Sequence, residues 1–156
     1  MASVDSLLLF SDAQAVTTDA VGTNVVDLSV DRGIGNGQPL CVVFVVDVAA
    51  DQTTGDEDYT FDVEYATNAA QTTGRQLVGR RVFESGTPTA PAQDADLLVA
   101  GFKFEIPIPA TNASEDAQFL GIRYDTTGTT PTITMTAYLS TSSGLYRPYP
   151  DGFTIS

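Results

Sequence analysis

The sequence predicts an all-β protein. Short runs rich in Thr, Val, Tyr and Phe recur along the chain, and clusters of Gly, Pro, Asn and Asp separate them. The chain lacks a convincing amphipathic helical pattern, in which apolar residues recur every three or four positions. A succession of about eight such turn-bounded strands is typical of a β-sandwich, a jelly roll or a small barrel.

Each expected strand has its own signal. The run 40–48 is the most apolar, which indicates a central strand. In 59–66, aromatic and aliphatic side chains alternate with Asp62 and Glu64, as in a strand with one buried face. Pro107 lacks a backbone N–H and is expected at a sheet edge or a strand end. The full set of expected strands is 6–10, 23–28, 40–48, 59–66, 76–84, 97–108, 118–124 and 132–139.

The organisation of the chain is simple. Its 156 residues fall within the usual size of one domain, and neither an internal repeat nor an interdomain linker is evident. We therefore expect a single domain over residues 1–156. The Pro-broken segment 144–156 is expected to form an extended C-terminal arm, and the N-terminal segment 1–11 either an edge strand or an arm that reaches a neighbour.

The charge of the chain excludes some partners. A formal net charge of −13, from 20 acidic and 7 basic residues, argues against direct binding of nucleic acid or an anionic membrane surface. The charge either serves solubility or belongs on the outside of an assembly, away from packaged nucleic acid. The sequence has no basic, apolar leader and no run of 18 apolar residues, so we expect synthesis in a cytoplasm without export by the general route.

The residue types needed for most enzyme chemistry are scarce. The chain has no histidine, which removes the commonest general base and metal ligand. Its single cysteine, Cys41, lies in an apolar run and is expected to be a small buried hydrophobe. We therefore expect no catalytic residues, no cofactor and no metal site.

Carboxylates offer the remaining chemical possibility. Asp62 and Glu64 lie two residues apart on one strand face, so a carboxylate-based hydrolase is one hypothesis, which Asp62→Asn or Glu64→Gln would test. Residues 56–58 read Asp-Glu-Asp, but their spacing does not match the calcium-binding loop pattern. We expect the first pair to be a solvated strand face and the second group a solvated acidic loop.

Interaction residues are concentrated near the C-terminus. Tyr146, Arg147, Tyr149 and Phe153 stand among prolines, and Tyr and Arg are enriched at interface hot spots. Prolines also extend a chain in advance and lower the entropy lost on binding. These four residues are the candidates for partner binding; the alternative is a tail that packs on its own sandwich.

Several segments carry a family resemblance. These segments are 8–17 (LLFSDAQAVT), 23–28 (TNVVDL), 31–35 (DRGIG), 37–40 (GQPL), 98–101 (LVAG), 104–109 (FEIPIP) and 121–124 (GIRY). In them the chain resembles the small capsid cement, or decoration, proteins of tailed bacteriophages, of the Bordetella-phage type. The similarity extends to around Ser140 and is most specific in the first forty residues.

The resemblance implies a fold and a role. It implies a single jelly-roll-like β-sandwich of about eight antiparallel strands with extended N- and C-terminal arms. It further implies a structural virion protein, not an enzyme, that is made in the host cytoplasm. Such a protein binds the outer surface of the phage head, bridges neighbouring major capsid proteins and forms homo-oligomers there. It brings no catalytic or binding residues to particular positions of this chain.

A second function remains open at this stage. Jelly rolls also bind sugars, so a carbohydrate- or receptor-binding module on the virion is the alternative. The absence of tryptophan argues against it, because aromatic platforms usually line sugar sites. A glycan array distinguishes the two functions.

Overall fold

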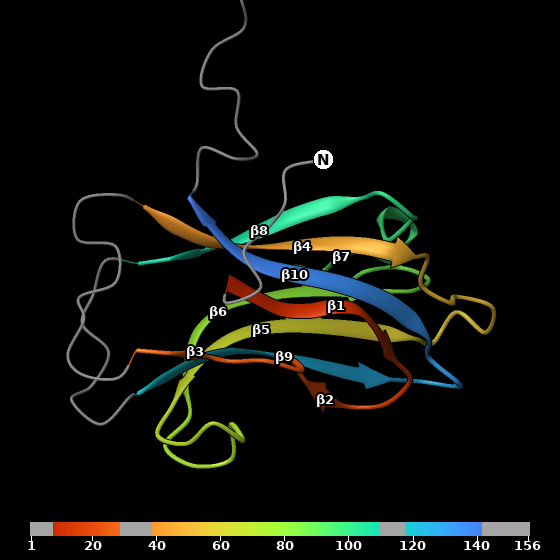
Figure 1. The fold of residues 1–156 in the computed structure, drawn as a ribbon. Coiled ribbons are helices and arrows are strands. Elements are labelled where there is room, and N and C mark those ends of the chain that lie inside the picture. The colour runs from red at the N-terminus through yellow and green to blue at the C-terminus, as the bar shows by residue number, and fades with distance from the viewer. Residues whose placement is uncertain (1–7, 29–38, 110–117, 142–156) are drawn as a thin grey trace, which may run out of the picture.

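The computed structural model describes residues 8–28, 39–109 and 118–141, which form two β-sheets packed face to face (Figure 1). The first sheet has the strand order β1-β10-β4-β8. The second has the order β2-β9-β5-β6-β7, and β3 also pairs with β9. The long strands are β1 (Leu9–Val16), β4 (Leu40–Val48), β5 (Asp58–Ala66), β6 (Gln76–Glu84), β8 (Lys103–Ile108), β9 (Phe119–Thr127) and β10 (Ile133–Thr141); β2 (Ala20–Val21), β3 (Val26–Asp27) and β7 (Gln93–Asp94) have two residues each.

The strand order is that of a jelly roll. Because β2 and β3 pair with the same strand, β9, they count as one interrupted strand. The strands then pair from the ends of the sequence inward, all antiparallel: β1 with β10, β3 with β9, β4 with β8, and β5 with β6. In a jelly roll, the antiparallel strand pairs of one long hairpin are divided between two packed sheets, and this chain has that arrangement. The expected fold class is confirmed, with one addition, because β7 pairs with β6 in parallel.

The core lies between the sheets and is built around aromatic rings. Phe44 of β4 stacks on Phe104 of β8 with ring centroids 5.0 Å apart, and Phe61 of β5 meets both rings edge-on. The buried Tyr124 of β9 has its hydroxyl 2.6 Å from that of Ser11 in β1, so its polar atom is satisfied inside the core. The contacts of Phe61 and Tyr124 connect the two sheets and hold them together.

Two expected strands are shorter than the sequence indicated. In 23–28 only Val26–Asp27 pairs with β9, because Asn24 instead donates its backbone N–H to the Phe10 carbonyl of the other sheet. In 97–108 the strand begins only at Lys103, after a turn in which Gly101 has φ +88°. Residues 95–97 form a short 3-10 helix (Ala95–Leu97) before that turn. Both predictions were wrong in extent, because a hydrogen bond to the other sheet interrupts the first strand and a turn precedes the second.

The other predicted strands are close to those observed. The runs 40–48 and 76–84 match β4 and β6, and β4 lies between β10 and β8 as a central strand. Pro107 lies in the edge strand β8, as predicted. β1 lies further along the chain than 6–10. Its register with β10 is irregular in two places, and Ala13 has φ +44°.

The start of β1, the end of β10, the start of β4 and the end of β8 lie close together in the first sheet. Leu9 at the start of β1 pairs with Tyr138, three residues before β10 ends at Thr141. Thr141 pairs with Leu40 at the start of β4, and Leu40 pairs with Ile108 at the end of β8. The start of β1 and the end of β10 therefore lie at the same end of the first sheet (Figure 1). Within the described ranges, no helix has the length and apolar character needed to cross a membrane.

Candidate interaction surfaces

The outer face of the second sheet is covered by ion pairs. Asp62 of β5 is fully buried, and its carboxylate accepts two hydrogen bonds from Arg80 of β6. The Nε–Oδ1 and Nη2–Oδ2 distances are 2.7 and 2.6 Å. The two residues are register partners, so the guanidinium lies across neighbouring strands. Two parallel charge-assisted bonds of this kind are the strongest geometry for an arginine and a carboxylate.

Glu64 continues this pattern along β5. Its side chain is 3% exposed and bonds to Arg75, from the connection between β5 and β6, and to Arg123 of β9. The expectation that Asp62 and Glu64 form a solvated strand face is therefore wrong. Alternation along β5 identifies the face correctly, but the arginines that cover it come from other parts of the sequence.

These contacts do not suit a hydrolase. A glycosidase needs one carboxyl that keeps its proton as a general acid and a second that is ionised. Here Asp62 and Glu64 each meet a guanidinium, and hydrogen bonds to these carboxylates raise the pKa of Arg80 and Arg75 further. The carboxylates therefore act as anchors between strands, and the hydrolase hypothesis has no support from this geometry.

The connection between β5 and β6 folds back over the same face. Gln71, at φ +56°, is fully buried and its amide lies against Gly121 of β9, where a Cβ atom would come within 2.6 Å of its Cδ. Arg123 donates from Nη2 to the Gln71 carbonyl at 2.8 Å. The side-chain Nε2 and Oε1 of Gln71 have no hydrogen-bond partner among the described residues. Packing against Gly121 and the hydrogen bond from Arg123 therefore hold the connection in place. The Gln71 side-chain amide lies buried beneath it without a hydrogen-bond partner among the described residues.

The acidic connection between β4 and β5 is organised around a buried carboxylate. Glu57 is fully buried and accepts hydrogen bonds from the Thr54 hydroxyl and from the backbone N–H groups of Thr54, Gly55 and Asp56. The bond from the Thr54 hydroxyl is the main reason that the pKa of Glu57 lies below its ordinary value. The expectation of a solvated acidic loop over 56–58 is therefore wrong for Glu57. In the described part of the chain, no three potential metal ligands are grouped around one point.

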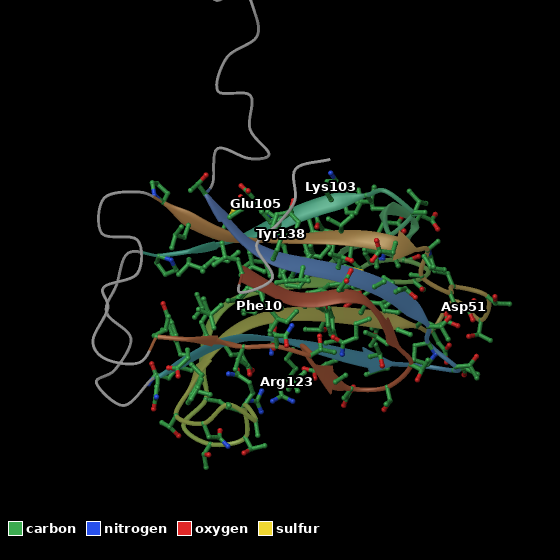
Figure 2. All side chains as sticks on the ribbon, in the orientation of Figure 1. Phe10, Asp51, Lys103, Glu105, Arg123 and Tyr138 are labelled. Carbon is green, nitrogen blue, oxygen red and sulfur yellow. The ribbon has the colours of Figure 1, made fainter. Side chains whose placement is uncertain are left out.

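The outer face of the first sheet is mostly uncharged. Tyr138, Val43 and Glu105 form one cross-strand row, which Leu9 extends on β1. None of these four residues belongs to the core cluster between the sheets. The rows on either side are Ser140, Cys41 and Pro107, and Thr136, Val45 and Lys103. Figure 2 shows Tyr138, Glu105 and Lys103 on this sheet and Arg123 on the other.

Cys41 is buried, as expected, but on this outer face and not in the core. Its Sγ donates to Glu105 Oε2 at 3.3 Å. Burial, together with the bond to the Glu105 carboxylate and that group's charge, raises the pKa of the Cys41 thiol to about 12. The thiolate is the reactive form of cysteine, so this thiol is inert at neutral pH.

A groove of about 430 Å³ runs between the edges of β6 and β8. Arg81 in this groove is exposed and makes no hydrogen bond or ion pair with any part of the chain that the structure describes. Its neighbour Arg80 also lines the groove, but Asp62 neutralises it. The lining residues are Val78, Gly79, Arg80, Arg81, Ile106, Pro107 and Pro109.

The partner-binding residues predicted from the sequence are not among those that the structure describes. Tyr146, Arg147, Tyr149 and Phe153 are outside the described residues. The surfaces described above were missed at the sequence level. The cross-strand rows depend on sheet register, and the groove depends on β6 and β8 lying beside each other.

The chain matches the model of a known protein family. The model of the Bbp16 family matches residues 10–139, a range that runs from β1 to β10. The search of the curated proteins found no match.

Proposed function

Because the chain belongs to the Bbp16 family, a family of the Bordetella-phage type, and is therefore a phage-related structural protein, we propose that it is a capsid cement protein. It binds the outer surface of the phage head, bridges neighbouring major capsid proteins and stabilises the shell against the pressure of packaged DNA. The observation that carries this proposal is the family match, because it extends across nearly the whole sandwich.

The outer face of the first sheet suits a protein partner best. Interface centres are depleted in charge and enriched in tyrosine. Tyr138 and Val45 are partly exposed on this face and Val43 beside them is buried, whereas the outer face of the second sheet carries the paired charges of Asp62 and Glu64. Removing water from paired charges is unfavourable unless the partner replaces it well. In our proposal the first sheet therefore faces the capsid and the second faces solvent.

The terminal segments support the same orientation. They join the sandwich beside Leu9 and Thr141, at one end of the first sheet. Tyr146 follows Thr141 by five residues, which span at most about 18 Å when extended. Tyr146, Arg147, Tyr149 and Phe153 can then contact the same partner surface. Many copies on a closed symmetric shell add avidity to weak single contacts, which favours a homo-oligomeric arrangement on the head.

Binding to heads tests the proposal. Purified protein is mixed with expanded heads that lack it, and bound protein is measured by co-sedimentation. The temperature at which the heads release their DNA is then recorded. We expect saturable binding and a higher release temperature. Heads of equal heat resistance with and without the protein, and no co-sedimentation, would contradict the proposal.

A further inference from the structure

The strand edges of the sandwich differ in how open they are to another strand. A free edge presents unpaired N–H and C=O groups and can act as a template for pairing. β1 is irregular in two places and has Ala13 at φ +44°, which disturbs its free edge. β8 carries Pro107, which lacks an N–H, and the exposed Lys103. β2, β3 and β7 have only two residues each.

β6 has the most open edge among the described strands. β7 pairs with it only at Phe83 and Glu84, so residues 79–82 have β5 on one side and no described strand on the other. Their register with β5 is regular from Glu84 to Gly79, and the irregularity lies beyond Gly79. Residues 79–82 therefore present a regular edge in line with β7.

The groove beside this edge carries one unpaired positive charge among the described residues, that of Arg81. Its walls from β6 and β8 are mainly apolar, and Arg81 is its one described cation without a partner in the chain, since Asp62 binds Arg80. A carboxylate is the natural partner of an exposed guanidinium. At physiological ionic strength the Debye length is about 8 Å, so solvent-exposed charges farther than this from a ligand in the groove are largely screened.

We propose that the groove between β6 and β8 binds an extended acidic peptide segment of a partner protein. The segment adds to residues 79–82 of β6 in line with β7 and sets a carboxylate against Arg81, while an apolar side chain packs against Ile106 and Pro107. Strand addition of this kind takes its affinity from main-chain hydrogen bonds and its specificity from alternate side chains. The groove shares Pro107 with the outer face of the first sheet, but its other lining residues lie outside the rows described for that face, and the inference does not depend on the cement function.

A peptide titration tests the inference. The full chain, labelled with ¹⁵N, is titrated with the capped peptide acetyl-Thr-Val-Glu-Val-Glu-Thr-amide and with the same peptide carrying glutamine for glutamate. We expect amide chemical-shift changes at residues 79–82 and 106, and binding of the acidic peptide about two- to fivefold tighter, as for one exposed ion pair. In Arg81→Glu this preference disappears or reverses.

Lys103→Glu is the matched control. Lys103 also makes no hydrogen bond or ion pair with the described residues, but it does not line the groove. The same change of charge there leaves the preference for the acidic peptide intact. Absence of shift changes in the groove at millimolar peptide, equal binding of the two peptides, or a preference that survives Arg81→Glu would each overturn the inference. The head-binding assay reads the cement function separately.

Discussion

Asp62, Glu64 and Glu57 have almost no exposed side-chain surface, and a different set of donors meets each carboxylate. Asp62 is held by one arginine in a two-bond fork, Glu64 by two arginines, and Glu57 by a threonine hydroxyl and backbone N–H groups. Buried charge of this kind stabilises a fold only while its partners remain in place. Single substitutions at these positions therefore test whether the partners of each buried carboxylate stabilise the fold.

Glu64→Gln removes the shared partner of Arg75 and Arg123. Breaking a fully buried pair costs several kcal/mol, but the Arg75 side chain is 42% exposed and can turn to solvent. We therefore expect the free energy of unfolding to fall by about 1–3 kcal/mol in urea titrations. Arg81→Gln, which removes a cation without a described partner, serves as the control and should change it by less than about 0.5 kcal/mol. Equal effects of the two substitutions would contradict the ion-pair description.

Gly121 and Gln71 form a second testable pair. Gly121→Ala places a Cβ atom about 2.6 Å from Gln71 Cδ, so the connection between β5 and β6 must shift. We expect a loss of about 1–3 kcal/mol in unfolding free energy. In Gly121→Ala combined with Gln71→Ala, the shortened side chain relieves the clash and removes the unsatisfied amide. Stability in the double variant should then exceed that of Gly121→Ala alone. Simple additivity of the two losses would show that the residues do not touch.

The Cys41 thiol gives a prediction about pH. Its pKa is raised from 9.0 to about 12, chiefly by burial, so the unfolded chain loses this proton at lower pH than the folded chain. The folded state therefore binds more protons between pH 9 and about 12, and stability falls as pH rises through that window. Burial raises the pKa of Tyr59 to about 12 as well, which acts in the same direction.

The measurement is the rate at which a disulfide reagent modifies the thiol at pH 8. Modification should be slow in the folded protein and fast in urea, because only opening exposes the thiol. Chevron plots at pH 7 and at pH 10.5 should give the lower stability at the higher pH. A thiol that reacts equally fast in both states would contradict its burial.

At the scale of elements, the edge strands explain how a β-sandwich avoids pairing with its own copies. Pro107 in β8 is tolerated because its nitrogen faces away from β4. Pro107→Val returns an N–H to that free edge, and we expect concentration-dependent self-association by light scattering. Pro109→Val is the control, since Pro109 lies beyond the end of β8. Association that is equal in both variants would mean that the edge of β8 is not the point of contact.

The elements also show what the sequence can predict. β4 and β6 were predicted to the residue because their apolar or alternating runs end in clear turn residues. β1 was placed too early because Ser11, Asp12 and Gln14 are polar although the strand continues through them. The segment 23–28 reads as a strand, yet a hydrogen bond from Asn24 to Phe10 in the other sheet interrupts it. Contacts between distant parts of the chain decide such cases, and no local pattern encodes them.

The candidate surfaces follow the same rule. Alternation in the sequence identified the acidic residues of β5 as one face of the strand. It did not predict that they are buried, because the arginines that cover them, Arg75, Arg80 and Arg123, come from other elements. The cross-strand row of Tyr138 and Val43 requires the register of β10 with β4. Composition argued against enzyme chemistry, and the C-terminal pattern of tyrosine, arginine and proline predicted a binding protein. The surfaces that could carry the binding emerged only from the three-dimensional arrangement.

At the scale of the whole molecule, the two outer faces are unequal, and this inequality gives a prediction about binding to heads. Tyr138→Ala removes an aromatic side chain from the outer face of the first sheet. If this face meets the capsid, we expect binding to heads to weaken by at least about tenfold, as for an interface hot spot. Leu77→Ala is the matched control, because Leu77 is an exposed apolar residue, 55% exposed, on the second sheet. A larger effect of Leu77→Ala would reverse the proposed orientation.

A cryo-electron microscopy map of the virion tests the cement function most directly. The proposal predicts a two-sheet jelly-roll density on the outside of the head that touches at least two neighbouring major capsid proteins. It also predicts that the sheet formed by β1, β10, β4 and β8 faces the shell. A map in which this fold is absent from the head, or is bound at another part of the virion, would contradict the proposed function.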